Sequence, residues 1–254
     1  MHERVEEQEP LRILSYNIHK GFASDNRRFV LAGIREAIKS TQADLVFLQE
    51  VQGAHARKAL RVKAWPSTSQ FEYLADKLWP HFAYGKNAVS YQGHHGNALL
   101  SRYPIRTWSN IDISTNPIEQ RGFLHAEIDL NGARVHCLCL HLSLFQGART
   151  KQLSAVADRI MRLVPTEEPL IIGGDFNDWR KRASDIIRRH TGAIEVFKTL
   201  HGRYARTFPS RFPVLALDRI YVRGFTPITA TVLRGAKWRM LSDHAALYAE
   251  VTRD

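Results

Sequence analysis

The sequence has no long uninterrupted run of apolar residues, and no stretch reaches the roughly 18 residues that a membrane-spanning helix needs. It also lacks a cationic start followed by an apolar segment, which is the pattern of a secretory signal. We therefore expect a protein without a transmembrane segment that works in the cytoplasm.

Cysteine is scarce. The two cysteines, Cys137 and Cys139, lie two residues apart in an apolar run, so in a strand they would point to the same face in parallel. That arrangement is poor for a disulfide, and a thiolate metal site would need further cysteines. We expect two buried free thiols.

The chain also lacks a linker rich in Ser, Gly or Pro, so we expect a single domain over residues 11–254. Residues 1–10 differ from the rest because they contain four glutamates within a short polar stretch, and they should form an acidic, frayed tail. Hydrophobic residues make up 44% of the chain, which is enough for a large core.

Acidic residues are outnumbered. There are 36 Lys and Arg residues against 25 Asp and Glu residues, which gives a net charge of +11. Such a surface attracts polyanions: nucleic acid, anionic lipid headgroups, including peripheral contact with an anionic membrane, or a small phosphorylated substrate. The net charge does not distinguish between these three kinds of partner.

One stretch places an acid and an amide where an apolar strand stops. Residues 170–172 read as a short buried strand, which Gly173 and Gly174 should end in a tight turn before Asp175 and Asn177. A carboxylate at the rim of a core is suited to hold a metal or a phosphate. An Asx-turn that merely closes a loop explains an isolated Gly-Asp-x-Asn equally well.

Other predicted strands also begin or end on polar residues. Strands 11–17, 43–50 and 133–140 end on or just before such a residue, and strands 217–222 and 245–251 begin beside one. The full set is Asn17, Glu50, His141, Asp175, Asn177, Asp218, Asp243 and His244. A single member is usually a structural hydrogen-bonded group. Eight together, rich in hard oxygen ligands and without a cysteine cluster, favour Mg²⁺ or Mn²⁺ acting on a phosphate.

The remaining pattern mixes helices with antiparallel strands. Asn131-Gly132 between two apolar strands is a strong hairpin signal, which argues against a purely parallel sheet. Apolar spacing predicts helices at 27–40, 69–78, 146–164 and 183–189, and further strands near 82–85, 97–101, 107–113 and 228–233.

Seven motifs between residues 11 and 251 together resemble the endonuclease/exonuclease/phosphatase superfamily, which includes DNase I-like nucleases, abasic-site endonucleases, inositol polyphosphate phosphatases and neutral sphingomyelinases. They run in the family's order. The motifs are Ser15-Tyr-Asn-Ile18, Leu48-Gln-Glu50, Gly96-Asn-Ala-Leu-Leu-Ser-Arg-Tyr-Pro104, His141-Leu142, Gly174-Asp-Phe-Asn177, Leu217-Asp-Arg-Ile220 and Ser242-Asp-His244. The extended segments 16–22 and 47–53 are similar to a bacterial branch associated with cardiolipin synthases.

The resemblance implies an α/β (α+β) fold of the DNase I-like type, a four-layer sandwich of two mainly antiparallel β-sheets flanked by α-helices. It also implies a metal site. Glu50 would be the main ligand with Asn17 beside it, and Asp243 would support the metal or the charge balance of the site.

The same resemblance assigns the reacting groups. Asp175 and Asn177 would position or activate the attacking water. His244, oriented by Asp218, would touch the scissile phosphate, and His141 would face it from the other half.

Two further residues are ambiguous in the sequence. Arg121 either binds a substrate phosphate or forms a surface salt bridge. Asn97 either lies at the edge of the site, where it would contact substrate, or stabilises the turn before its strand.

We predict a Mg²⁺- or Mn²⁺-dependent hydrolase of phosphodiester bonds, in the first place a DNase I-like nuclease. The alternatives are an enzyme for phospholipid headgroups or small phosphodiesters, and a non-catalytic module that binds polyanions. No expected catalytic residue type is missing, which disfavours the binding module. The sequence does not decide between His244 and Asp175 as general base, and it leaves the oligomeric state open.

Overall fold

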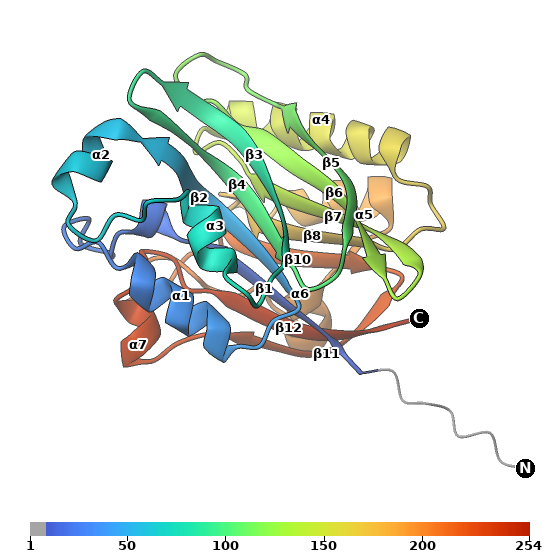
Figure 1. Cartoon of the computed structure of the whole chain (residues 1–254). Coiled ribbons are helices and arrows are strands. Elements are labelled where there is room, and N and C mark those ends of the chain that lie inside the picture. The colour runs from blue at the N-terminus through green and yellow to red at the C-terminus, as the bar shows by residue number, and fades with distance from the viewer. Residues whose placement is uncertain (1–8) are drawn as a thin grey trace, which may run out of the picture.

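The computed structural model describes residues 9–254, so the acidic tail expected at 1–10 lies almost wholly outside the described residues (Figure 1). Two six-stranded sheets pack face to face. One has the order β11-β12-β1-β2-β4-β3 and the other β5-β6-β7-β8-β10-β9. Each sheet has four antiparallel pairs and one parallel pair, β1 with β2 and β7 with β8. The predicted sandwich of mainly antiparallel sheets is confirmed.

The first sheet is built from β1 (Leu11–Asn17), β2 (Leu45–His55), β3 (His81–Ser90), β4 (Gly93–Ser101), β11 (Phe225–Val232) and β12 (Leu247–Arg253). The second is built from β5 (Ile105–Asp112), β6 (Gly122–Leu130), β7 (Ala133–His141), β8 (Leu170–Asp175), β9 (Ile194–Glu195) and β10 (Asp218–Arg223). The helices are η1 (His19–Gly21), α1 (Leu31–Ser40), α2 (Ala56–Arg61), α3 (Gln70–Ala75), α4 (Gln146–Leu163), α5 (Ala183–Thr191), α6 (Val196–His201) and α7 (Ala236–Arg239).

Alternating side chains of the strands create the layers. On β1, Ile13 enters the core between the sheets, whereas Leu14 and Tyr16 enter a second core under α1 and α3. A third core lies between the second sheet and the pair α4 and α5. Because central strands such as β1 are covered on both faces, they are continuously apolar in sequence. Cys137 and Cys139 are free and buried between the sheets, as predicted.

The predicted hairpin is also present. Asn131 and Gly132 both have positive φ, 52° and 88°, which the two-residue turn between β6 and β7 requires.

The prediction that Gly173 and Gly174 end a strand is wrong. Both lie inside β8, which continues to Asp175. A Cβ on Gly173 would come within 2.8 Å of the ring of Phe47, and one on Gly174 within 2.2 Å of the carbonyl oxygen of Leu140. These glycines therefore allow close packing against the other sheet and a neighbouring strand instead of a turn.

The predicted end of a strand at Glu50 is wrong as well, because β2 continues to His55. Its pairing with β4 shifts between Leu48 and Val51, and Glu50 has a φ of 56°. A bulge of this kind re-aims a side chain. Glu50 is therefore placed by an irregularity inside a strand.

Two helices have boundaries that differ from the predicted ones. The predicted helix at 27–40 begins only at Leu31, because Phe29 forms an isolated bridge with Phe22. The helix predicted from Ser69 begins there with a capping box between Ser69 and Glu72, but it already ends at Ala75. No helix in the described part of the chain is long and apolar enough to cross a membrane.

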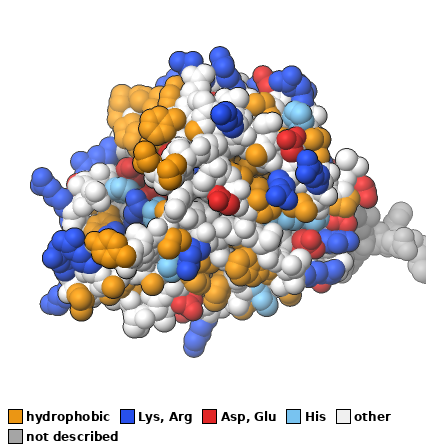
Figure 2. Space-filling view, turned by 90° about the horizontal axis from the view of Figure 1, so that it is seen from above, with side chains coloured by type: hydrophobic (Ala, Val, Ile, Leu, Met, Phe, Trp, Pro, Cys, Tyr) orange, Lys and Arg blue, Asp and Glu red, His pale blue; other side chains and the backbone are white. Residues whose placement is uncertain are grey.

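Positive charge gathers at one end of the sandwich. Figure 2 shows Lys and Arg side chains crowding the left-hand edge, the end that bears α2, while the opposite side mixes both signs. The segments at that end hold 17 of the 36 Lys and Arg residues and 4 of the 25 Asp and Glu residues. They are 18–30, 56–69, 91–92, 113–121, 142–145, 176–182, 202–217 and 233–246. The rest of the chain is nearly neutral.

Candidate active site

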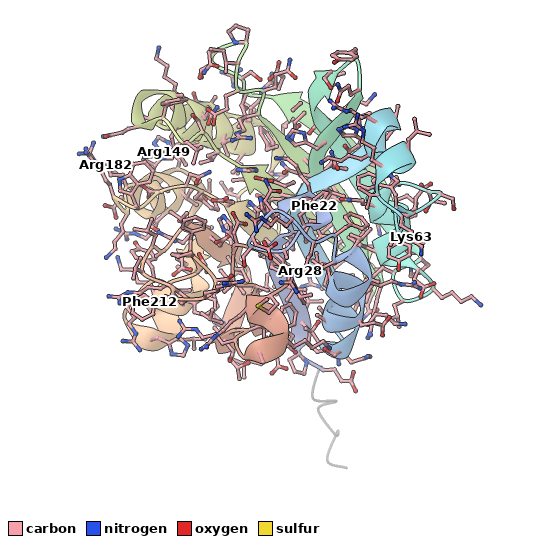
Figure 3. The ribbon with its side chains drawn as sticks, turned by 90° about the vertical axis from the view of Figure 1, so that its left-hand side faces the viewer. Phe22, Arg28, Lys63, Arg149, Arg182 and Phe212 are labelled. Atoms are coloured by element: carbon pink, nitrogen blue, oxygen red, sulfur yellow. The ribbon has the colours of Figure 1, made fainter. Side chains whose placement is uncertain are left out.

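The predicted site residues meet at this basic end, where β1 and β8 end and β10 and β12 begin. Figure 3 looks onto this end and labels Arg28, Lys63 and Arg182 on it. Strand register alone brings three of them together, since Asp175 at the end of β8 is paired with His141 on β7 and with Asp218 on β10. Asn17, the last residue of β1, donates a 3.1 Å hydrogen bond from Nδ2 to Oδ2 of Asp175. This bond joins the two sheets at the site.

Two imidazoles flank Asp175. Nε2 of His141 and Nε2 of His244 each lie 3.6 Å from Oδ2 of Asp175. The other ring nitrogen of His244, Nδ1, lies 2.9 Å from Oδ2 of Asp218. All four side chains are buried. The predicted pairing of Asp218 with His244 is therefore present in the geometry.

The charges of Asp175, Asp218 and His244 determine which of these side chains carries a proton. Burial lowers the pKa of His244, but the carboxylates of Asp218 and Asp175 and the hydrogen bond to Asp218 raise it to about 10. Burial raises the pKa of Asp175 to about 6; Asp218 adds to that rise, and the charge of His244 opposes it. At neutral pH His244 is thus an imidazolium that Asp218 holds by Nδ1–H, with its Nε2–H free for a ligand.

The other imidazole, that of His141, is unprotonated. Burial, reinforced by the charge of Arg121, moves the pKa of His141 well below its ordinary value, so this ring is neutral. Burial would raise the pKa of Glu50, but nearby positive charge lowers it to about 2. Because His141 is neutral near pH 7, we assign most of that charge to Lys20, whose Nζ is 3.2 Å from Oε2 of Glu50.

The donor set fits a hard divalent cation. Oε2 of Glu50 is buried, and the contact found for it within residues 9–254 is the ion pair of 3.2 Å with Nζ of Lys20. Oδ1 of Asn17 accepts one hydrogen bond, from the backbone N–H of His19 at 3.0 Å, and keeps a lone pair. A carboxylate and an amide oxygen are ligands that Mg²⁺ and Mn²⁺ accept.

A second cluster has metal-ligand geometry at the same site. Donor atoms of Asp175, Asp218 and His244 lie within 4.8 Å of one another. The proton on Nε2 of His244 near pH 7 blocks that nitrogen as a ligand. Glu50 with Asn17 is therefore the better candidate for the cation.

Asp243 lies at the rim of the site. Its Oδ1 is 3.8 Å from Nδ1 of His19, and its side chain is 29% exposed. Its neighbour Ser242 is the structural member of the motif, because its hydroxyl donates to the carbonyl oxygen of Asn17 at 2.7 Å and accepts from the backbone N–H of His244.

Asn177 closes an Asx-turn, and this turn is also part of the site. Its backbone N–H donates to Oδ1 of Asp175 at 2.9 Å, which is an Asx-turn, and its Nδ2 donates to the carbonyl oxygen of Leu142. The residue has a φ of 48°. Its main contribution in this geometry is to hold the carboxylate of Asp175.

Asn97 does not stabilise a turn, because β4 begins four residues earlier, at Gly93. Its Nδ2 donates to the carbonyl oxygens of Gly122 and Cys139, so it ties the two sheets together. Its buried Oδ1 has no hydrogen-bond partner among the described residues.

Arg121 forms a salt bridge, but a largely buried one, and its contact with a substrate phosphate stays a prediction. The distance to Glu119 is 2.9 Å. Asn97 and Arg121 line a narrow cavity that also touches Glu50, His95 and His141.

Lys20 and His95 belong to the site and were missed in the sequence. His95 is partly buried, and burial followed by the charge of Lys20 lowers its pKa to about 4. Lys20 follows the motif residue Ile18 by two positions, and His95 directly precedes the motif that begins at Gly96. Their position beside recognised motifs was the available signal.

The sequence comparison agrees with this geometry. The family model described as "Endonuclease/Exonuclease/phosphatase family" matches residues 14–244. The chain belongs to the endonuclease/exonuclease/phosphatase family. A relative from Escherichia coli (strain K12), named "Uncharacterized protein YbhP", is 47% identical over 247 residues and covers 96% of this chain and 97% of its own.

Several solved structures share the fold at low identity. An endonuclease/exonuclease/phosphatase from Beutenbergia cavernae matches with a TM-score of 0.75 and 18% identity, over 97% of this chain and 72% of that one. TDP2 of D. rerio in complex with a single-strand DNA product matches with a TM-score of 0.69 and 21% identity, over 96% and 100%. A mannosyl-6-phosphatase from Bacteroides thetaiotaomicron matches with a TM-score of 0.71 and 18% identity, over 95% and 99%.

Proposed function

We propose that this chain is a divalent-metal-dependent phosphodiesterase that acts on nucleic acid. The observation that carries the proposal is the position of Asp175, whose Oδ2 has Nε2 of His141 and Nε2 of His244 each 3.6 Å away. Membership of the family and the Asp218–His244 pair support hydrolysis of a phosphoester. Cytoplasmic location and the narrower likeness to the cardiolipin-synthase-associated branch stay predictions.

The proposed chemistry divides between the buried groups. Protonated His244 donates Nε2–H to an oxygen of the phosphoryl group, and Asp218 keeps the ring in the orientation that allows it. Asp175, with a pKa of about 6, is ionised near pH 7 and accepts the proton of the attacking water. The water oxygen bonds to phosphorus as the ester P–O bond breaks, and the leaving oxygen takes a proton from solvent. A divalent cation held by Glu50 and Asn17 would neutralise charge on the phosphate oxygens.

The assignment of the general base follows from these protonation states. His244 carries its proton at neutral pH, so it is a donor, and the base is Asp175. Neutral His141 contacts the phosphate from the opposite side, and Asn177 fixes Asp175. Asn97 and Arg121 bind substrate at the inner edge of the site, and Asp243 supports the charge balance at its rim.

Nucleic acid is the first choice of substrate because the basic end offers room for a polyanion. A cleft of about 930 Å³ beside the segment 202–217, which leads into Asp218, is lined by Arg203, Arg206 and Arg234, and also by Tyr204. No Asp or Glu of residues 9–254 lines this cleft. Cations interleaved with an aromatic ring suit a phosphate backbone with bases.

A second candidate is a lipid headgroup or another small phosphoester. It is favoured by apolar side chains exposed at the same end, Leu144, Phe145 and Phe212, which would tolerate a bilayer surface. The similarity to a mannosyl-6-phosphatase also supports a small phosphoester as the substrate.

Turnover on a substrate panel tests the proposal. Plasmid DNA, single-stranded DNA, RNA, an abasic-site duplex, glycerophosphodiesters and phospholipid vesicles are compared with Mg²⁺, with Mn²⁺ and with EDTA. We expect metal-dependent cleavage of nucleic acid to dominate. Good turnover of a lipid or small diester with poor turnover of every nucleic acid would replace the proposal with the second candidate.

A further inference from the structure

A second cleft opens beside the site, on the side of Glu50. It has a volume of about 390 Å³ and one cationic wall, formed by Lys20 and Lys58. His55 and His95 also line it, and burial lowers the pKa of both imidazoles, so they are neutral near pH 7. Lys20 connects it to the centre, because its Nζ lies 3.2 Å from Oε2 of Glu50. His95 lines both this cleft and the narrow cavity that contains Glu50.

The ammonium group of Lys58 is held in a fixed place without a counter-charge. Its Nζ donates to Oε1 of Gln52 at 3.1 Å and lies 4.8 Å from the ring centroid of Phe22 and 5.9 Å from that of Trp65. Lys58 forms no salt bridge with any residue between 9 and 254. Two of its three N–H donors remain for a ligand.

One buried side chain fixes both halves of the cationic wall. Gln70 is fully buried, accepts the backbone N–H of Gln52 at 2.9 Å and donates to the carbonyl oxygen of Lys20 at 2.9 Å. The two lysines are therefore positioned in advance of binding, which lowers the entropy cost of holding an anion. Val89 and Ile118 form an apolar wall of the same cleft, and both are exposed.

We infer that this cleft is an anion subsite that binds a second phosphate of the substrate, next to the scissile phosphate, through Lys58 and Lys20. The inference rests on the proposed function for the scissile phosphate. No Asp or Glu of residues 9–254 lines this cleft, and Glu50, which pairs with Lys20, lines the narrow cavity instead. A phosphate in the cleft would accept hydrogen bonds from both ammonium groups, and the apolar wall would contact the group that joins the two phosphates.

Binding without metal separates this subsite from catalysis. The full-length protein in EDTA is titrated calorimetrically with thymidine 3′,5′-bisphosphate, thymidine 5′-monophosphate and thymidine 3′-monophosphate. We expect the bisphosphate to bind at least about tenfold more tightly than either monophosphate, as a charge-assisted hydrogen bond allows. A parallel titration with glycerol 3-phosphate and glycerol 1,3-bisphosphate shows if a lipid-type headgroup meets the same requirement.

Three variants test whether the preference for two phosphates depends on Lys58. Lys58→Gln should remove most of the preference for two phosphates, and Lys58→Arg should keep it because the charge remains. Lys63→Gln, an exposed lysine of the same segment outside the cleft, should bind like the wild type.

An equal preference in the wild type and in Lys58→Gln would overturn the subsite, even if the protein cleaves DNA. Loss of the preference in Lys58→Gln with its rescue in Lys58→Arg would support it, even if DNA is not cleaved. Equal binding of one and two phosphates by the wild type would also overturn it.

Discussion

Replacement of Asp218 by Asn should move the titration of His244 to lower pH. The Nδ1–Oδ2 contact is 2.9 Å long and buried, and the pKa of His244 is raised from 6.5 to about 10. Removal of a hydrogen-bonded opposite charge shifts a pKa by about 1 to 3 units. Since Asp175 remains at 3.6 Å, we expect the pKa of His244 to fall by about two units, to about 8.

The same change has a predicted effect on stability. Because the folded-state pKa of His244 lies above the unfolded value of 6.5, its protonation stabilises the fold fully below pH 6.5, and this is lost as pH rises towards about 10. A difference of two pKa units corresponds to about 3 kcal/mol of free energy of unfolding. The wild type should exceed Asp218→Asn by about this free energy of unfolding below about pH 8, and the gap should close by about pH 10.

The assay is a ¹⁵N NMR titration of the His244 ring, with urea unfolding at several pH values as the second readout. A pKa in Asp218→Asn within about half a unit of the wild type would refute the assigned role of Asp218. Glu36→Gln is a matched surface control, since that carboxylate is exposed on α1 and should leave both readouts unchanged.

Three further predictions follow from the site, the fold and the charge. The losses of transition-state free energy in Asp218→Asn and His244→Ala should overlap in the double mutant, because the residues act as one unit; strict additivity in kcat/KM would reject the pairing. Gly173→Ala should lower the free energy of unfolding by about 1 to 3 kcal/mol, because its Cβ would press on Phe47. Gly147→Ala, with nothing within 4 Å, should not, and equal unfolding midpoints would contradict the packing argument. Binding of duplex DNA should weaken with salt by a slope of about −0.9 per phosphate contact, whereas a small diester should give a shallow slope; tight, nearly salt-independent DNA binding would contradict the electrostatic account.

The sequence was informative where one local rule decides the structure. The Asn131-Gly132 turn and the doubly buried β1 followed from turn chemistry and apolar continuity, and both are present. The polar strand ends at Asn17 and Asp175 also predicted a common site, because strands of two sheets end side by side there.

Sequence reasoning failed where contacts between distant segments decide. Gly173 and Gly174 are ordinary turn signals locally, and only the nearby Phe47 and Leu140 explain them inside a strand. The bulge at Glu50 depends on its pairing with β4.

Functional side chains were missed for the same reason. Lys20 and His95 come from separate elements and meet only at the site. Helix α2 was missed because it has no buried residue and so no apolar stripe in the sequence.

The most direct test of the central claim is metal-dependent hydrolysis by wild type and Glu50→Gln, measured on DNA across a titration of Mg²⁺ or Mn²⁺. The substitution removes the ligand charge at nearly constant side-chain size. We predict wild-type turnover that requires Mg²⁺ or Mn²⁺, and loss of nearly all of it in Glu50→Gln at saturating metal with an unchanged unfolding midpoint. Wild-type-like turnover by Glu50→Gln, or a requirement for zinc alone, would contradict the account.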